Sequence, residues 1–513
     1  MTADRPFFVT TPIYYVNDAP HLGHAYTTVA CDVLARFMRL DGRRVKFLTG
    51  TDEHGQKVEQ SARLAGISPQ QFTDRISGVF RDMTRLLDIS NDDFIRTTEP
   101  RHVRGVQVLW QELERRDEIY LGRFAGWYSI RDEAFYDESE LVDGKAPSGA
   151  EVEWLEEENY FFRLSAWQDR LLAYYEANPE AVAPRSRRNE VVSFVKSGLR
   201  DLSISRTSFR WGIPVPGNPD HVIYVWLDAL ANYITAAGYP DTQSLEFSTF
   251  WPANLHVVGK DILRFHAVYW PAFLMAAGLE PPRRIFAHGW WTVEGQKMSK
   301  SLNNFIPPRQ LVDTYGLDPV RYFLLRELPF GSDGDFSHRA VVGRLNGDLA
   351  NDFGNLAQRV LVMINRNCGG CVPDFGELRA GDQALLNAAQ KLLDAVREHI
   401  AEQAFHLALE AIWRVIGEAN RYVDEQAPWA LSRSEPARMR TVLYTLAETL
   451  RHLAILAQPF VPGAAQKLLD QLAIPDAARS FAALADAPLV PGTQLPKPDA
   501  IFPRFVEAEA GNS

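Results

Sequence analysis

Cysteine is scarce in this chain, which has 3 cysteines among 513 residues. With so few cysteines the fold does not depend on a disulfide framework, which agrees with a reducing compartment. No run approaches the roughly 18 apolar residues that a membrane-spanning helix needs, and no charged-then-apolar leader opens the sequence. We therefore expect a soluble, cytoplasmic protein with no membrane partner.

The chain also lacks an excess of basic residues. Its formal net charge is -11 at pH 7, whereas a protein that binds nucleic acid mainly by neutralising phosphate charge is usually basic. A nucleic-acid partner would have to be recognised through local basic patches and shape. Neither G-x-G-x-x-G nor G-x-x-x-x-G-K-[ST] occurs, so the dinucleotide-binding and P-loop classes lack their signatures.

Hydrophobic residues make up 46% of the chain, which is ample for the two to four domains expected at roughly 100–200 residues each. Near the N-terminus, strand patterns alternate with helical ones. Strands are expected at Phe7–Thr10 and Arg44–Thr49, and helices at Gly23–Leu40, Lys57–Ala65 and Pro69–Leu87, the last capped by Ser68. This alternation predicts an α/β fold with a doubly wound parallel sheet of the Rossmann type.

The expected secondary structure changes three times along the rest of the chain. Short aromatic runs and acidic clusters suggest an inserted α+β module, after which sheet patterns resume with strands expected at Tyr224–Asp228, Leu255–Val258 and Ile285–Ala287. Asp318 is expected to cap a helix. Later apolar spacing is helical throughout and predicts an all-α bundle. The predicted segments are 1–115 (first half of the catalytic domain), 116–223 (inserted connective module), 224–340 (second half and lysine loop), 341–487 (helical domain) and 488–513 (extended tail).

Two motifs far apart in the sequence carry candidate chemistry. Pro20-His21-Leu22-Gly23-His24 lies where a helix is expected to begin, and helix N-termini bind phosphate through free N–H groups. His21 and His24 would share one face, and Gly23 would allow a ligand to approach closely. Lys297-Met298-Ser299-Lys300-Ser301 places two lysines on a loop, where they suit charge that develops during a reaction. Alone, each motif also fits an exposed polar surface.

Together these motifs resemble the methionyl-tRNA synthetase family of class I aminoacyl-tRNA synthetases. The resemblance covers the chain from about residue 6 to 505. It also rests on six stretches in the family's order: Thr11–Asn17, Gly50–Gly55, Asp201–Arg206, Tyr224–Ala229, His256–His266 and Asp424–Trp429. It implies a ligase that activates L-methionine with ATP and Mg²⁺ to methionyl-adenylate and pyrophosphate, then charges the 3′ end of tRNA(Met).

The resemblance also implies residue roles. The catalytic group would be His21, His24, Lys297 and Lys300, with Gly23 and Ser299 completing the ATP site. The methionine site would take Ile13, Tyr15, Asp52, Trp226, Ala229, Leu230, Tyr233, Ile262, Phe265, His266 and Trp270, in which Asp52 pairs with the substrate ammonium. Aromatic rings suit a thioether because sulfur is polarizable. From spacing alone, Trp226, Ala229, Leu230 and Tyr233 fit a buried helix face equally well.

Further expectations concern the insertion and the helical domain. By resemblance, Asn355, Arg359 and Trp429 contact the CAU anticodon. Many relatives have a zinc knuckle with paired cysteines in the insertion, but here the matching positions are Ser129 and Asp132, so we expect no structural zinc. We interpret Cys368-Gly-Gly-Cys371 as a turn between helices and Cys31 as a core residue. Nothing past Arg504 resembles the dimerisation domain of some relatives, so a monomer is expected.

Three other functions remain open at this stage. A catalytically silent RNA-binding paralogue is opposed by the intact motifs. A class I synthetase for leucine, isoleucine or valine would need a large editing insertion, and one for cysteine would need metal ligands. A small-molecule nucleotidyltransferase would not need the C-terminal bundle. The conformation of the loop that bears Lys297 and Lys300 cannot be deduced from the sequence.

Overall fold

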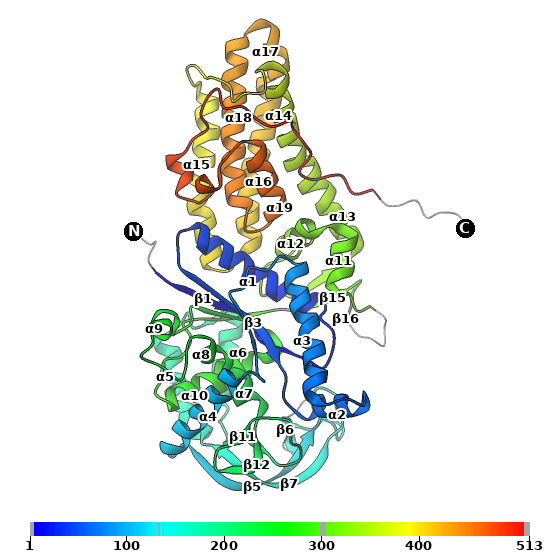
Figure 1. Ribbon diagram of the computed structural model, residues 1–513, viewed down its shortest axis with the longest axis vertical. Coiled ribbons are helices and arrows are strands. Elements are labelled where there is room, and N and C mark those ends of the chain that lie inside the picture. The colour runs from blue at the N-terminus through cyan, green and yellow to red at the C-terminus, as the bar shows by residue number, and fades with distance from the viewer. Residues whose placement is uncertain (1–4, 132–133, 137, 298–303, 507–513) are drawn as a thin grey trace, which may run out of the picture. The chain divides into compact units, whose positions relative to one another are not determined.

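The computed structural model describes residues 5–131, 134–136, 138–297 and 304–506 of the 513-residue chain. It divides into two compact units (Figure 1). The sheet unit comprises Pro6–Cys31 and Lys46–His288, and the helical unit comprises Met1–Arg5, Asp32–Val45 and Gly289–Ser513. Helix α1 (Leu22–Leu40) begins in the sheet unit and ends in the helical unit. The five predicted segments remain a prediction.

The sheet unit contains a seven-stranded sheet with the order β2-β3-β1-β13-β14-β8, in which β4 also pairs with β3. The pairings β1/β13, β13/β14, β14/β8, β2/β3 and β3/β4 are all parallel, which confirms the predicted sheet type. Its strands are β1 (Phe7–Thr10), β2 (Tyr14–Tyr15), β3 (Val45–Asp52), β4 (Asp93–Arg96), β8 (Val182–Ala183), β13 (Leu255–Gly259) and β14 (Ile285–His288). All four residues of β1 are buried, as expected for a parallel sheet covered on both faces.

Helices α2 (Gln56–Leu64) and α3 (Pro69–Leu86) begin within one residue of the predicted positions. Helix α4 (Pro100–Arg115), for which no prediction was made, follows β4. Ser68 caps α3 as predicted, because its hydroxyl oxygen accepts a hydrogen bond from the Gln71 backbone N–H at 3.2 Å. Gln71 returns a side-chain contact to Ser68 N, which completes a capping box.

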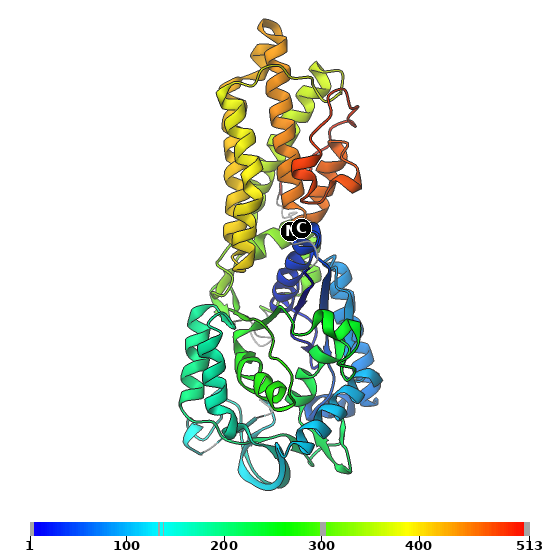
Figure 2. The same ribbon diagram turned by 90° about the vertical axis from the view of Figure 1, so that its left-hand side faces the viewer.

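The predicted inserted module is a mixture of strands and helices. One antiparallel sheet has the order β6-β5-β7-β9, and a second has the order β10-β12-β11. The strands are β5 (Ile119–Ser129), β6 (Ala134–Tyr136), β7 (Glu153–Phe162), β9 (Leu202–Ser203), β10 (Ser205–Arg206), β11 (Pro214–Val215) and β12 (Asn218–Ile223). Helices α5 (Gln168–Ala177) and α6 (Arg185–Lys196) pack side by side (Figure 2). Strand β8, from within the same segment, joins the parallel sheet.

The predicted strand at Tyr224–Asp228 is wrong. The chain forms helix α7 (Val225–Leu230) there, followed by α8 (Asn232–Ala236). The run is apolar and almost wholly buried, and a short buried apolar run has no periodicity that separates a strand from a helix. The helical spacing of Trp226, Ala229 and Tyr233 was the informative signal. The unit is completed by α9 (Leu245–Phe250) and α10 (Trp270–Ala276).

The helical unit confirms the predicted all-α domain, and its long helices run alongside one another (Figure 1). They are α14 (Asn355–Asn367), α15 (Ala380–Ala401), α16 (Phe405–Gln426), α17 (Pro428–Ser434), α18 (Pro436–Ala457) and α19 (Pro462–Gln471). Before them come α11 (Pro308–Tyr315), α12 (Leu317–Arg326), α13 (His338–Arg344), a π-helical stretch (Leu345–Gly354), and the strands β15 (Trp291–Val293), β16 (Gln296–Lys297) and β17 (Gly334–Phe336). In the described part of the chain, every helix is too short or too polar to cross a membrane.

Asp318 does not cap its own helix, which corrects a second expectation. Helix α12 begins at Leu317, two residues earlier than an Asp318 cap would place it, after Gly316 at φ 87°. The Asp318 carboxylate instead accepts hydrogen bonds from the backbone N–H groups of Gly463 at 3.3 Å and Ala464 at 2.5 Å. These belong to the first turn of α19, so Asp318 satisfies free amides of another helix. Sequence position cannot reveal such a long-range cap.

Three helices of the bundle meet at the buried carboxylate of Asp382 in α15. It accepts hydrogen bonds from Arg438 of α18, from Nη1 at 2.5 Å and Nη2 at 2.7 Å. Tyr422 of α16 donates to the same carboxylate, and the Arg379 N–H donates at 2.8 Å. Breaking such a buried pair is costly because the remaining charge stays in a poor solvent.

We expect Asp382→Ala to lower the free energy of unfolding by about 3–5 kcal/mol, since it removes the acceptor of the Arg438 guanidinium. The combined change Asp382→Leu with Arg438→Met should recover most of that loss, because no buried charge remains. Urea unfolding followed by circular dichroism measures both. Equal loss in the single and double variants would contradict the explanation.

Candidate functional site

The two histidines of the N-terminal motif lie together at the start of α1. Their ring centroids are 4.0 Å apart. The His21 backbone N–H donates to His24 Nδ1 at 3.1 Å, and the Gly23 N–H donates to His21 Nδ1 at 3.0 Å. A Cβ at position 23 would lie 2.9 Å from His21 Cε1, so the absence of a side chain allows this arrangement.

Burial keeps both rings uncharged. It lowers the pKa of His21, and this outweighs the opposing effect of Asp18 and Asp261. Burial lowers the pKa of His24 further, well below its ordinary value, and His21 adds to the effect. A neutral imidazole that accepts a hydrogen bond at Nδ1 carries its proton on Nε2. Both histidines are therefore neutral hydrogen-bond donors through Nε2, a property suited to phosphate oxygens.

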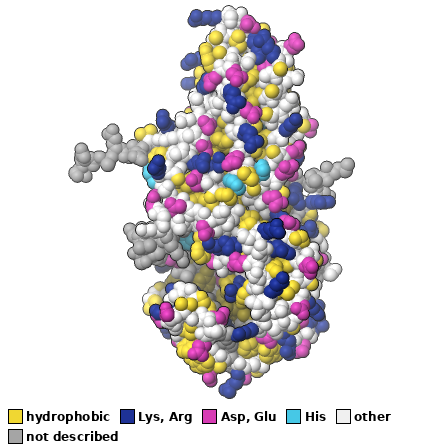
Figure 3. All heavy atoms as spheres, turned by 180° about the vertical axis from the view of Figure 1, so that it is seen from behind, with side chains coloured by type: hydrophobic (Ala, Val, Ile, Leu, Met, Phe, Trp, Pro, Cys, Tyr) yellow, Lys and Arg dark blue, Asp and Glu magenta, His cyan; other side chains and the backbone are white. Residues whose placement is uncertain are grey.

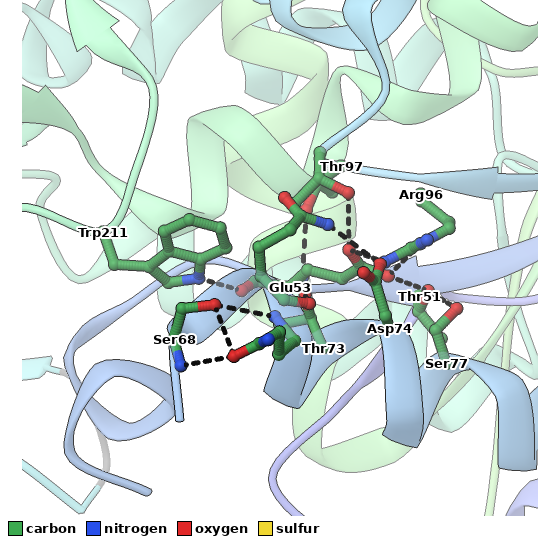
Figure 4. A network of polar contacts seen from close by, with 12 residues as sticks. Thr51, Glu53, Ser68, Thr73, Asp74, Ser77, Arg96, Thr97 and Trp211 are labelled. Carbon is green, nitrogen blue, oxygen red and sulfur yellow. Dashed lines mark hydrogen bonds and ion pairs between the residues drawn. The ribbon is translucent and has the colours of Figure 1, made fainter. Parts of the chain in front are cut away.

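The end of β3 is anchored through the buried carboxylate of Glu53 (Figure 4). Arg96 Nε and Nη2 donate to Glu53 at 2.6 and 2.9 Å, and the hydroxyls of Thr98 and Thr51 donate at 2.6 and 2.8 Å. Arg96 also contacts Asp74 of α3 at 2.5 Å. The carboxylate thus has four donor groups, which is what a buried charge requires.

The backbone around Asp52 is held as well. The Glu53 N–H donates to Thr97 Oγ1 at 2.9 Å, and Trp211 Nε1 donates to the Glu53 carbonyl at 2.5 Å (Figure 4). On the other side, the Val16 N–H donates to the Asp52 carbonyl at 3.2 Å. Asp52 itself is 8% exposed. Its carboxylate is therefore carried by a strand end with little freedom to move.

An aromatic cluster forms in the same unit. The rings of Trp226 and Phe265 stack at 3.7 Å with planes 7° apart. Tyr233 and His266 are joined by an Oη–Nε2 hydrogen bond of 2.8 Å, and His266 Nδ1 lies 2.9 Å from the Ile262 carbonyl oxygen. Burial lowers the pKa of His266 to about 4, so the ring is neutral, donates from Nδ1 and accepts the tyrosine hydroxyl at Nε2.

Partly exposed and buried residues divide this cluster into two layers. Ile13, Trp226, Ile262 and Phe265 are partly buried and pack against a core that contains Leu230, Tyr233 and Trp270. Ala229 is also buried. The structure thus brings together most of the residues predicted for methionine, with partly buried apolar side chains packed against buried ones.

In the helical unit, two of the three predicted anticodon residues are in contact. The Arg359 guanidinium lies over the Trp429 ring, 5.6 Å from its centroid, and donates to Asp424 at 2.8 Å. Trp429 is 52% exposed. Asn355 is exposed at the start of α14, one turn before Arg359. An exposed ring beside a fixed cation suits stacking with a nucleic-acid base.

Comparison with known proteins places these features in a family. Residues 7–152 and 139–361 match the model described as tRNA synthetases class I (M), and residues 372–512 match the anticodon binding domain of methionyl tRNA ligase. The methionine–tRNA ligase of Mesorhizobium japonicum is 58% identical over 99% of both chains, and that of Brucella suis is 57% identical over 99% of both. The chain belongs to the methionyl-tRNA synthetase family.

A solved structure of a family member has the same fold. Methionyl-tRNA synthetase of Mycobacterium tuberculosis in complex with methionyl-adenylate is 55% identical, with a TM-score of 0.95, and the match covers 98% of this chain and 100% of that one. The predicted fold class, a parallel-sheet catalytic domain and a helical anticodon-binding domain, is therefore confirmed.

The second family motif is only partly described. Lys297 ends β16, after a turn at Glu294 and Gly295 with φ angles of 49° and 76°. Ser299 and Lys300 lie outside the described residues. The histidines belong to the sheet unit and Lys297 to the helical unit. Their predicted convergence on ATP therefore remains a prediction.

Two cysteine interpretations are confirmed. Cys368 ends α14, and Gly369 and Gly370, at φ 62° and 70°, form a turn in which the Cys371 N–H donates to the Cys368 carbonyl at 3.1 Å. Cys31 is fully buried. Among the described residues, no three His, Cys, Asp or Glu side chains are grouped to hold a metal. Ser129 lies in β5, and Asp132 is not among the described residues.

Sequence reasoning missed the residues that support the site. Glu53 and His54 follow Asp52 in a motif that was noticed, and Asp228 follows Trp226 in another, yet none received a role. His102 and Arg96 lie outside every family stretch quoted above. Their signal is spatial: Asp228 lies between the rings of His54 and His102, which are far apart in the sequence.

We expect Glu53→Leu to lower the free energy of unfolding by about 3–5 kcal/mol, because it removes the buried acceptor of Arg96 and two threonines. Glu53→Gln keeps one carbonyl acceptor and should cost less. Thr98→Val, which removes a single donor and leaves the charge pair intact, should cost about 1–3 kcal/mol. Chemical unfolding measures the order, and a Leu variant as stable as the Gln variant would contradict it.

Proposed function

We propose that this chain activates L-methionine with ATP and transfers the methionyl group to the 3′ end of tRNA(Met) in translation. The main support for this proposal is the family match over the length of the chain. The geometry agrees with it, because the sheet unit contains both the anchored strand end with Asp52 and the Trp226–Phe265 cluster. The relative from Mycobacterium tuberculosis binds methionyl-adenylate, the intermediate of this reaction.

Activation needs no nucleophile from the protein. The methionine carboxylate attacks the α-phosphate of ATP, a phosphorus–oxygen bond to the leaving group breaks, and pyrophosphate departs. In the second step, the 3′-terminal ribose hydroxyl of tRNA attacks the methionyl carbonyl carbon and releases AMP. Catalysis therefore depends on positioning and on electrostatic stabilisation.

We assign the ATP contacts to both motifs. His21 and His24 donate from Nε2 to phosphate oxygens, and Gly23 leaves room for the nucleotide. Lys297 and Lys300 neutralise the charge that grows on the departing pyrophosphate, and Ser299 contacts ATP beside them. Mg²⁺ accompanies ATP and screens its phosphates. Because the ion prefers phosphate and water ligands to a protein cage, the described residues suit it without a dedicated acidic cluster.

Methionine is recognised by charge at one end and by shape at the other. We propose that the Asp52 carboxylate pairs with the substrate ammonium. The thioether lies against the aromatic layer, where Trp226, Phe265 and Trp270 offer ring edges that favour sulfur. The remaining contacts that we assign are Ile13, Tyr15, Ala229, Leu230, Tyr233, Ile262 and His266. The Tyr233–His266 hydrogen bond supports this role because it fixes the orientation of both rings.

The CAU anticodon is assigned to the helical unit. The exposed Trp429 ring is the stacking platform, Arg359 supplies a charged donor beside it, and Asn355 supplies an amide. On the face in Figure 3, acidic and basic side chains are intermingled, and the net charge is -11. Selective recognition of tRNA therefore depends on such local contacts and not on a broad basic surface.

Three finer properties belong to the same proposal. The inserted module is held without zinc, through the long β5/β7 ladder and an edge-to-face pair of Trp127 and Trp154 with centroids 5.4 Å apart. We also propose that the enzyme acts in the cytoplasm, which agrees with a fold that does not depend on disulfides. We also propose that it is a monomer, and sedimentation analysis, which should give the 57.9 kDa mass of one chain, tests this.

Methionine should be the preferred amino acid in ATP–pyrophosphate exchange. We expect kcat/KM for cysteine, leucine, isoleucine and valine to be lower by a factor of about 100 or more. Homocysteine, which lacks one methyl group, should compete at a cost of only about 1–3 kcal/mol. No exchange with any amino acid would favour a silent RNA-binding paralogue, and preference for another amino acid would contradict the assignment.

Trp429→Ala should impair tRNA charging and spare methionine activation. Loss of one stacked base is worth about 1–3 kcal/mol, so kcat/KM for tRNA should fall about 10- to 100-fold. Pyrophosphate exchange without tRNA should stay within about twofold of the unchanged enzyme. Trp154→Ala is the matched control, because that ring is 53% exposed against 52% for Trp429. Equal losses of charging in both variants would refute the assignment of Trp429.

A further inference from the structure

A buried carboxylate that the proposed mechanism does not use joins two parts of the methionine site. Asp228 is fully buried. Its Oδ2 lies 2.7 Å from His54 Nδ1, and its Oδ1 lies 2.8 Å from His102 Nε2. Both histidines are buried as well. The three residues come from α7, from the loop after β3 and from α4, and all belong to the sheet unit.

The ends of this bridge lie next to proposed substrate contacts. His54 is two residues after Asp52, and Asp228 is two residues after Trp226 and directly before Ala229. Glu53 binds Arg96, and Arg96 in turn contacts Asp74 of α3. His54 instead connects it to α7. The bridge thus crosses from the residue proposed for the ammonium group to the helix proposed for the thioether.

The hydrogen-bond pattern defines how each group is protonated. Burial alone would raise the pKa of Asp228, but His54 and His102 together hold it below its ordinary value, so the carboxylate is ionised. An ionised carboxylate only accepts hydrogen bonds. His54 therefore donates from Nδ1 and His102 from Nε2, and each ring is held in one orientation.

A second contact makes His54 a fixed support. Its ring packs edge-on against Trp211, with centroids 5.4 Å apart. Trp211 in turn donates to the Glu53 carbonyl, and the Gly55 N–H donates to the Trp211 carbonyl at 3.0 Å. A displacement of His54 would therefore move the segment that continues from Asp52.

We propose that Asp228, held between His54 and His102, is a positioning residue that sets the distance between the Asp52 carboxylate and the Trp226–Ala229 turn of α7. This inference rests on the proposed methionine site. A thioether substrate that bridges an ammonium contact and an aromatic layer binds well only when the two are correctly spaced. Asp228 acts on methionine binding without touching the substrate, so its loss should raise KM for methionine more than it changes kcat.

The test is Asp228→Asn, which preserves shape but leaves an amide that cannot accept from both histidines. In pyrophosphate exchange we expect KM for methionine to rise about tenfold or more, while KM for ATP stays within about twofold and kcat within about threefold. A purely structural role would lower the amount of active enzyme and leave both KM values unchanged. That result would overturn the proposal.

Asp382→Asn is the matched control. Asp382 is equally buried and hydrogen-bonded, but it lies in the helical unit, so it should reduce stability with no change in KM for methionine. An equal rise in KM for this variant would also overturn the proposal, because the effect would then report general loosening.

A pair of variants at His54 decides the question if Asp228→Asn fails to fold. His54→Asn offers an amide N–H near the position of Nδ1, whereas His54→Leu keeps bulk and removes the donor. We expect KM for methionine to rise about tenfold in the Leu variant and less than about threefold in the Asn variant. Identical values would overturn the proposal.

Measurements on the unchanged enzyme distinguish a failure of the proposed function from a failure of the proposed role of Asp228. Absence of methionine-dependent exchange in the unchanged enzyme would refute the proposed function itself. Normal exchange in that enzyme, with unchanged KM for methionine in Asp228→Asn and His54→Leu, would refute only the role of Asp228.

Discussion

The proposed methionine site in the sheet unit depends on a fixed position for the end of strand β3. An acidic side chain can hold a substrate ammonium with a defined geometry only if its own backbone does not move, and Asp52 is the last residue of β3. The Glu53 carboxylate provides that restraint because it is buried and fully hydrogen-bonded. A buried ion pair contributes little net stability in general. We infer that the Glu53–Arg96 pair instead favours a single conformation of the strand end that carries Asp52.

A second feature of the site is that its buried histidines are uncharged. Burial lowers the pKa of His21, His24 and His266, so these rings supply directed hydrogen bonds and no permanent charge. In the proposed ATP site, positive charge comes instead from Lys297 and Lys300 on a separate segment. This division suits a reaction in which negative charge moves from the α-phosphate to the leaving pyrophosphate, because fixed cations would also stabilise the ground state.

The sequence was sufficient for the fold class. The residues assigned to substrate contacts remain predictions, and no local pattern pointed to the residues that support them. Strand β1 and the cap of α3 follow from local patterns. Helix α7 was mistaken for a strand because burial on all sides removes the periodic signal. Asp318 and Asp228 act on partners more than 100 positions away, and no local pattern encodes such a pairing. The family resemblance named Asp52, yet only the structure reveals Glu53 and His54 as its supports.

Selection of a thioether explains why so much buried polar structure surrounds an apolar site. Methionine offers no side-chain hydrogen bond by which it could be told from other amino acids, so discrimination rests on shape and on the ring edges that favour sulfur. Shape discriminates only if the walls do not adapt, and apolar contacts alone are non-directional. Directed contacts such as Tyr233–His266 and His54–Asp228 supply the missing rigidity. These directed contacts hold the apolar surface in one shape, and a fixed shape is what selection of a thioether requires.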